Sequence, residues 1–375
     1  GSLYRAGMVG QDGRNSQGDS DVLIRYWRWA LEWLLAVTAG CVGSADTGPV
    51  SCEAVDGVDV IGGLVAPVDI ERTRDNSALV VGVLGPPGGL LLLDPATDAV
   101  TTVYGERAGR AEPEPGWGDN ACVEPPSWLQ SHGIDVRQRA DGRVQVLAVN
   151  HAERESVEYL ELVPGNGGTE AIWRGCVIGP EYANFNDAVG LADGGFLVTH
   201  MASNDFPALR GLQAWLGMNT GHVYRWHPEQ GFSIVPGSDA RMPNGMALAA
   251  DGESYYINEY FGNRVRRHAL PGGELMASAS EEQPDNLAWT EDGRLLVASH
   301  PVGLMELLAS LEQGYESPSL LPFDVIELDA ESLASRTLLS RDGPPMGAGT
   351  VALQHGDHVY IGSYVGERII KVPLN

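Results

Sequence analysis

The sequence predicts an all-β protein, a six-bladed β-propeller with an N-terminal helix and partly helical loops over one face. Three observations carry this prediction. A strand-turn-strand unit recurs along the chain, its copies are spaced as propeller blades are, and glycine is abundant, with 48 residues, while aromatic residues make up only 7%.

The repeated unit is a polar pair, a short apolar strand, an Asp-Gly turn and a second strand, which is typical of a β-hairpin. The clearest copies begin at Asn186-Asp187, Asn244-Gly245 and Asp285-Asn286. In each copy the second residue of the pair lies six positions before the Asp of the turn. This recurrence predicts several hairpins of one kind.

Looser copies around Asp69, His132 and Ala348 bring the number of units to six. The units begin near residues 68, 132, 186, 244, 285 and 348, which leaves room for four strands in each. Closing the ring requires N-terminal sequence to complete the blade that contains residues 359–373. The alternative is a linear solenoid. Residues 204–218 and 302–321 are expected to form the partly helical loops over one face.

The chain before the repeats has two parts. Residues 1–21 are polar and are expected to be disordered or tag-derived. Residues 22–41 are apolar and Trp-rich and are expected to form a helix with Arg25, Arg28 and Glu32 along one side, so an export signal, an interfacial anchor and a packed helix all remain open. Residues 52–375 are the expected propeller domain.

Charge and cysteine content restrict the partners and the compartment. A formal charge of -26 argues against nucleic acid as a partner and suits cations, although solubility alone also explains it. The four cysteines contain no CxxC pair, which argues against a thiolate zinc site. If the protein is exported, Cys122 and Cys176 are the expected disulfide, and if it is cytosolic all four are buried small residues.

Polar residues at the start of each unit are the candidate functional groups, because inner strands of a propeller line one central channel. Asn186, Asn244 and the pair Asp285-Asn286 form an all-oxygen set of the kind that Ca²⁺ accepts. Asn and Asp also form turns without any function, and we assign that structural role to the Asp of each Asp-Gly turn. Polar groups repeated at equivalent channel positions would instead be a desolvation cost, which favours a function.

Three histidines belong to the same region. His132 opens its unit, and His151 and His300 end strands of theirs. A histidine beside a metal-held carbonyl can act as general base, oriented by a second histidine, although each alone is more often structural.

Together these segments resemble the paraoxonase/arylesterase family, calcium-dependent six-bladed propeller lactonases related to the gluconolactonase and strictosidine synthase groups. The matching segments are Ser131-His132-Gly133-Ile134, Leu147-Ala148-Val149-Asn150-His151, Asn186-Asp187, Pro243-Asn244-Gly245-Met246, Asp285-Asn286 and Ser299-His300-Pro301.

The resemblance implies two calcium ions. Asn186, Asn244, Asp285 and Asn286 would hold a catalytic ion, and Asp69, Asp187 and the carbonyl of Ile134 a structural ion. It also implies that His132 and His151 activate water and that His300 lines the pocket.

Two departures qualify the resemblance. The family places a Glu directly before the residue matched by Asp69, where this chain has Val68. Either the expected metal site is weaker, or Asp69 or Glu71 shifts in register to serve the metal. Cys52 matches one partner of the family's terminal disulfide, but the C-terminus has no cysteine to pair with it.

The expected function is a calcium-dependent hydrolase that opens small-molecule lactones or cleaves aryl esters. His132 would take the proton of the attacking water, with Asp285 as the other candidate base. Phe206 and Trp215 on the covering loop would face the substrate.

An exported location is expected, periplasmic, anchored or secreted, with membrane-surface contact through residues 22–40 left open. The alternatives are a non-catalytic ligand-binding propeller with a structural channel calcium, which Val68 favours, and a relative with carbon-nitrogen condensation chemistry.

Overall fold

A computed structural model describes residues 57–105, 110–165, 168–311, 315 and 317–374. The chain divides into a unit of residues 1–48 and a unit of residues 49–375, and the described residues belong to the second unit. The expectations for residues 1–21 and 22–41, and those for Cys41 and Cys52, lie outside the described residues. Neither described helix has the length and hydropathy of a membrane span.

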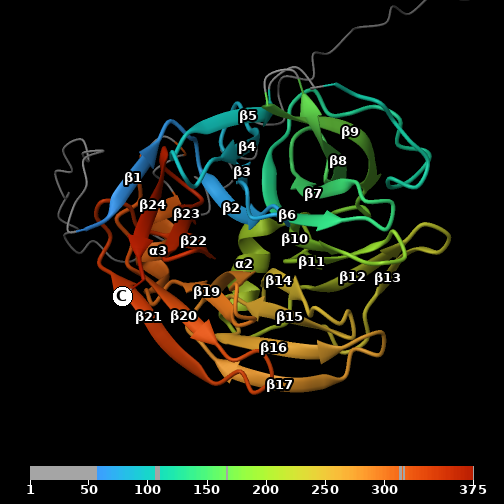
Figure 1. Ribbon diagram of the computed structural model, residues 1–375. Coiled ribbons are helices and arrows are strands. Elements are labelled where there is room, and N and C mark those ends of the chain that lie inside the picture. The colour runs from blue at the N-terminus through green and yellow to red at the C-terminus, as the bar shows by residue number, and fades with distance from the viewer. Residues whose placement is uncertain (1–56, 106–109, 166–167, 312–314, 316, 375) are drawn as a thin grey trace, which may run out of the picture. The chain divides into compact units, whose positions relative to one another are not determined.

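The described chain forms six four-stranded antiparallel sheets arranged around a centre (Figure 1). Five sheets are hairpin meanders of consecutive strands. They are β2 (Pro67–Arg72), β3 (Leu79–Val83), β4 (Gly89–Leu93) and β5 (Val100–Tyr104); β6 (Ser131–Gln138), β7 (Val144–Asn150), β8 (Ser156–Gly165) and β9 (Gly168–Ile178); β10 (Phe185–Gly190), β11 (Phe196–His200), β12 (His222–His227) and β13 (Gly231–Ile234); β14 (Pro243–Leu248), β15 (Ser254–Glu259), β16 (Arg264–Ala269) and β17 (Leu275–Ser280); β18 (Pro284–Trp289), β19 (Leu295–Ser299), β20 (Phe323–Leu328) and β21 (Ser335–Arg341).

The sixth sheet closes the ring by joining the two ends of the propeller. It contains β22 (Gly349–His355), β23 (His358–Ser363) and β24 (Arg368–Pro373), and its outer strand is β1 (Asp59–Gly62). Ile61 of β1 pairs with Ile369 of β24 in an antiparallel register. The predicted six-bladed propeller is confirmed, with N-terminal sequence completing the last blade.

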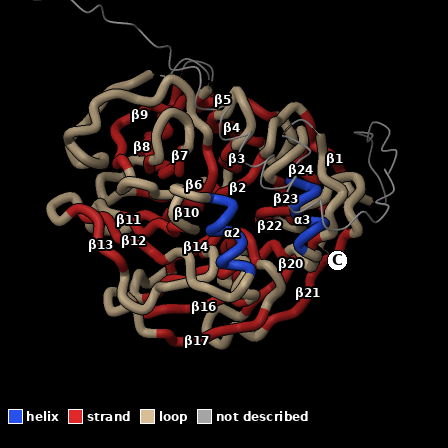
Figure 2. Tube along the Cα trace, turned by 180° about the vertical axis from the view of Figure 1, so that it is seen from behind, coloured by secondary structure: helices blue, strands red, loops and turns tan. Residues whose placement is uncertain are grey.

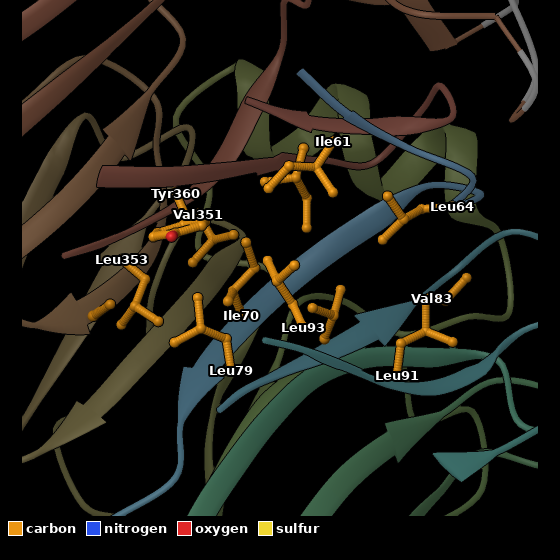
Figure 3. Close-up of a cluster of buried hydrophobic side chains, with 13 residues drawn as sticks. Ile61, Leu64, Ile70, Leu79, Val83, Leu91, Leu93, Val351, Leu353 and Tyr360 are labelled. Atoms are coloured by element: carbon orange, nitrogen blue, oxygen red, sulfur yellow. The ribbon is translucent and has the colours of Figure 1, made fainter. Parts of the chain in front are cut away.

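Apolar clusters fill the spaces between adjacent blades. One of them spans the closure, where Ile61 and Ile369 pack with Ile70 of β2 and Val351 of β22 (Figure 3). The inner strands β10, β14 and β18 are buried almost throughout, as expected of strands covered on both faces.

The Asp-Gly turns have the structural role expected of them. Gly252 and Gly293 have φ of +71° and +82°, a region that glycine enters without steric cost. The preceding Asp251 accepts the N–H of Glu253 at 2.9 Å through Oδ1, which is an Asx turn. These carboxylates therefore stabilise the turns between the first and second strands of their blades.

Two helices and a disulfide complete the described fold. Helix α2 (Pro207–Trp215) follows β11 and helix α3 (Leu304–Leu311) follows β19, so both leave from the channel end at which the inner strands begin. Both views place α2 over the centre of the ring and α3 beside the closing blade (Figures 1 and 2). The predicted disulfide between Cys122 and Cys176 is present, with Cα atoms 5.5 Å apart.

Candidate active site in the propeller channel

A β-bulge at the start of the inner strand positions each polar pair. The pairing register between β10 and β11 shifts between Phe185 and Ala188, which leaves Asn186 and Asp187 outside the ladder. The same shift occurs at the starts of β6, β14 and β18. A bulge bends the strand and re-aims its side chains. The bulges therefore bring the pairs together at one end of the channel.

The backbone groups that the bulges release are bound by side chains of neighbouring blades. Asp69 Oδ2 accepts the N–H of Ile134 at 2.8 Å, and Asp187 Oδ2 accepts the N–H of Met246 at 2.8 Å. Thr199 Oγ1 donates to the carbonyl of Asn244 at 2.7 Å. These bonds satisfy buried backbone polarity and link consecutive blades. The role of Asp69, Asp187 and the Ile134 carbonyl in a structural calcium site stays a prediction.

Three buried amide oxygens of the pairs have no hydrogen-bond donor among the described residues. They are Oδ1 of Asn186, Asn244 and Asn286. The Nδ2 end of Asn286 donates to the carbonyl of Val68 at 3.4 Å, which leaves its oxygen for another partner. Unsatisfied buried oxygens cost free energy unless a donor or a cation reaches them. They are therefore candidate ligands.

Several carboxylates lie in the channel, where burial and mutual repulsion disfavour their negatively charged forms. Burial, and then the charge of Asp69, raises the pKa of Asp285 well above its ordinary value, while a hydrogen bond from Asn244 opposes the shift. Burial also raises the pKa of Asp69 to about 7 and that of Asp135 to about 6. The pKa of Asp187 is raised by burial and by the charge of Asp69. A cation in the channel would offset this charge.

The donor set fits a hard cation. Three amide oxygens and the Asp285 carboxylate are the ligand type that Ca²⁺ prefers, and the set contains no thiolate. No group of three or more His, Cys, Asp or Glu side chains arranged for a metal is found in the described part of the chain, so most donors would be amides. Val68 is buried and apolar, and it presents only its carbonyl, which also accepts Thr350 Oγ1 at 2.7 Å.

A row of hydrogen-bonded side chains lies beside this cluster. His132 Nδ1 is 2.9 Å from His151 Nε2, and His132 Nε2 is 3.4 Å from Nδ2 of Asn186. Burial, and then the neighbouring His151, lowers the pKa of His132 to about 3. The predicted dyad is thus assembled, and its outer nitrogen faces a candidate metal ligand.

Sequence reasoning missed Glu155, which extends this row. His151 Nδ1 lies 2.9 Å from Glu155 Oε2. The only signal in the sequence is that Glu155 follows His151 by four residues. This spacing brings two side chains together on a helix, and no helix is expected here.

His300 is fixed on the other side of the cluster. Its Nε2 donates to the carbonyl of Gly349 at 2.8 Å, so its Nδ1 accepts from the hydroxyl of Tyr260 at 2.9 Å. His300 Nδ1 is 3.8 Å from Asp285 Oδ2. Burial lowers the pKa of His300 to about 4, so it stays neutral at pH 7. Tyr260 was also missed, because nothing in its local sequence sets it apart.

The two predicted substrate residues on the covering loop lie farther out. Trp215 ends α2 and Phe206 caps its start, and they are 50% and 65% exposed. They share the channel face with the polar pairs, and contact with a substrate stays a prediction.

A cavity of about 420 Å³ opens at the other end of the inner strands and is not part of this site. Its lining includes Glu71, Arg72 and Arg137 near the ends of β2 and β6. It lies a strand's length from the polar pairs.

One segment of the chain matches a known family model. Residues 145–307 match the family model described as the SMP-30/Gluconolactonase/LRE-like region. The segment includes His151, Asn186, Asn244, Asp285, Asn286 and His300. No curated protein sequence matches the chain.

Solved propellers resemble the structure at low sequence identity. A luciferin-regenerating enzyme aligns with a TM-score of 0.50 and 14% identity, over 84% of this chain and 94% of that chain. A gluconolactonase from Xanthomonas campestris aligns with a TM-score of 0.49 and 15% identity, over 90% and 99% of the two chains. A putative gluconolactonase aligns with a TM-score of 0.47 and 13% identity, over 85% and 92%.

The likeness to the luciferin-regenerating enzyme extends to the fold and no further. The resemblance to paraoxonases themselves stays a prediction. The family match makes the middle of this chain, with most of the candidate site, similar to the SMP-30/gluconolactonase group.

Proposed function

We propose that this protein is a calcium-dependent hydrolase that opens lactones, and aryl esters as secondary substrates, by attack of water at the channel site. The observation that carries the proposal is the juxtaposition of three unsatisfied amide oxygens and buried Asp285 with the His132 and His151 pair. The family match over residues 145–307 supports the substrate class.

The residues of the site divide into ligands and a base. Asn186, Asn244, Asp285 and Asn286 would hold the cation. A bound cation supplies Lewis-acid polarisation of the substrate carbonyl and stabilisation of the developing oxyanion. Burial lowers the pKa of His132, so its imidazole is neutral at pH 7 and can take a proton from water at Nε2. His151 holds the His132 ring in place through Nδ1.

The test is turnover of a panel of γ- and δ-lactones with varied alkyl chains, together with phenyl acetate. Rates are compared in the purified protein, after removal of metal with EGTA and after calcium is restored. We expect lactone hydrolysis that disappears with EGTA and returns with calcium. Folded, calcium-loaded protein without turnover on the whole panel would refute the proposal and leave the ligand-binding propeller.

A further inference from the structure

Glu155 completes a row of hydrogen bonds that begins at His132. Its carboxylate lies in the loop between β7 and β8 and is 18% exposed. Oε2 is 2.9 Å from His151 Nδ1, and Oε1 accepts the backbone N–H of Phe185, the first residue of β10. Glu155 is thus anchored to the strand that carries Asn186.

The row has only one arrangement of hydrogens when both imidazoles are neutral. A carboxylate can only accept, so Nδ1 of His151 carries its hydrogen. His151 Nε2 then has a lone pair and accepts from His132 Nδ1 at 2.9 Å. His132 Nε2 is left unprotonated, 3.4 Å from the amide of Asn186. The basic nitrogen therefore lies on the ligand side of the ring.

We propose that Glu155 is a positioning residue that fixes the tautomers of His151 and His132, so that the basic nitrogen of His132 faces the site. Its kinetic consequence rests on the proposed function, but the tautomers do not. When His132 Nε2 takes a proton from water, the O–H electron pair forms the new bond to the carbonyl carbon and the C=O π pair moves to the carbonyl oxygen. The positive charge on the two imidazoles is then offset by the carboxylate. When C=O re-forms, the bond from the carbonyl carbon to the ring oxygen breaks, and that oxygen takes the proton from His132.

The variant Glu155→Gln isolates this role because the side chains have the same size. Gln has one acceptor oxygen, and the N–H of Phe185 takes it. Its amide then faces His151 Nδ1 as a donor, which reverses the row and places a hydrogen on His132 Nε2. We expect kcat on the best lactone to fall roughly 100-fold with KM within about twofold of wild type.

The matched control is Glu153→Gln, in the same loop. Glu153 is exposed and accepts the N–H of Ser127 at 2.9 Å and the Ser127 hydroxyl, and it makes no hydrogen bond to the histidines. The Glu153→Gln substitution removes the same negative charge as Glu155→Gln, and we expect its kcat to stay within about twofold of wild type. An equal loss in both variants would show a general effect of loop charge and overturn the proposal.

A measurement on the wild-type protein does not depend on turnover. In ¹⁵N-histidine-labelled full-length protein, with His151 assigned through His151→Gln, we expect protonated Nδ1 and bare Nε2 on His151 at pH 7. Hydrogen on Nε2 of His151 would refute the proposal. If no lactone is hydrolysed, the proposed function fails, and the nitrogen spectrum alone decides the role of Glu155.

Discussion

At the scale of single residues, Asp285 and His132 should differ in how much activity depends on them. Asp285 is the one carboxylate among the candidate ligands of the catalytic ion, and stabilising charge at the oxyanion is the larger share of the expected rate effect. We expect Asp285→Ala to lose roughly 1,000-fold or more in kcat/KM on lactones, and His132→Ala about 100-fold. Steady-state kinetics at saturating calcium measures both, with calcium binding followed by calorimetry. Equal, modest losses would contradict these assignments.

A second residue-scale prediction concerns stability in acid. Burial, and then the charge of His222, lowers the pKa of His200 to about 4 from 6.5. Between these values the unfolded chain binds a proton that the folded protein does not, so stability is lost as pH falls from 6.5 to 4. Full loss amounts to about 3 kcal/mol for this histidine.

Urea unfolding of wild type and His200→Asn between pH 7.5 and 4 measures this loss. The Asn oxygen can replace Nδ1 as acceptor for the N–H of Asn184, which lies 3.1 Å away in the wild type. We expect the variant to be less stable at pH 7.5 and to lose less stability on acidification. Parallel curves for the two proteins would contradict a neutral, buried His200.

The sequence predicted the candidate ligands better than it predicted what orients them. Asn186, Asn244 and Asp285 stand at equivalent positions of a repeat, and repetition is visible in one dimension. Glu155 and Tyr260 act through a histidine on a different strand, so their roles depend on tertiary contacts. Asp69 was predicted as a metal ligand, and its backbone bond to Ile134 could not be seen without the bulge.

At the scale of elements, close approach of inner strands fixes the site. A Cβ on Gly245 would lie 2.5 Å from Cα of Asn286 and 2.7 Å from the carbonyl oxygen of Asp285. Both atoms belong to the backbone of β18, which cannot yield without moving the polar pair. This contact explains why the second position of the pair in β14 is glycine.

We therefore expect Gly245→Ala to lower the free energy of unfolding by about 2 kcal/mol and to weaken calcium binding. Gly211→Ala in α2 is the control, because nothing lies within 4 Å of its added Cβ and alanine favours a helix. Urea unfolding and calorimetry compare the two variants. Equal stability of Gly245→Ala and wild type would show that the strands can separate at no cost.

Residues 204–218 and 302–321 were predicted as loops with partial helix, and this is confirmed at Pro207–Trp215 and Leu304–Leu311. Pro207 stands where proline favours a helix start, but the start of α2 has no side-chain cap to mark it in the sequence.

At the scale of the whole molecule, blade size and the missing final strand predicted a closed ring, but the sequence left a linear solenoid open. The identity of the closing strand could not be predicted, because β1 has only four residues and no repeat signal. Its pairing with β24 is a contact between the two ends of the propeller, which only the folded ring creates.

Closure gives the last prediction. Ile61 is 5% exposed and packs between the first and last blades, so Ile61→Ala should remove roughly 3 kcal/mol. In a closed ring that unfolds as one unit, this loss reaches every blade. Hydrogen exchange measures the free energy of opening of the most protected amides. In Ile61→Ala this free energy should fall by the same amount in β14, across the ring, as in β23. In an array of independent neighbours, only β23, β24 and β2 would respond, because each repeat contacts only the next. If the change in exchange is confined to those strands, β1 only pairs with the edge of β24 and does not make the propeller unfold as one unit.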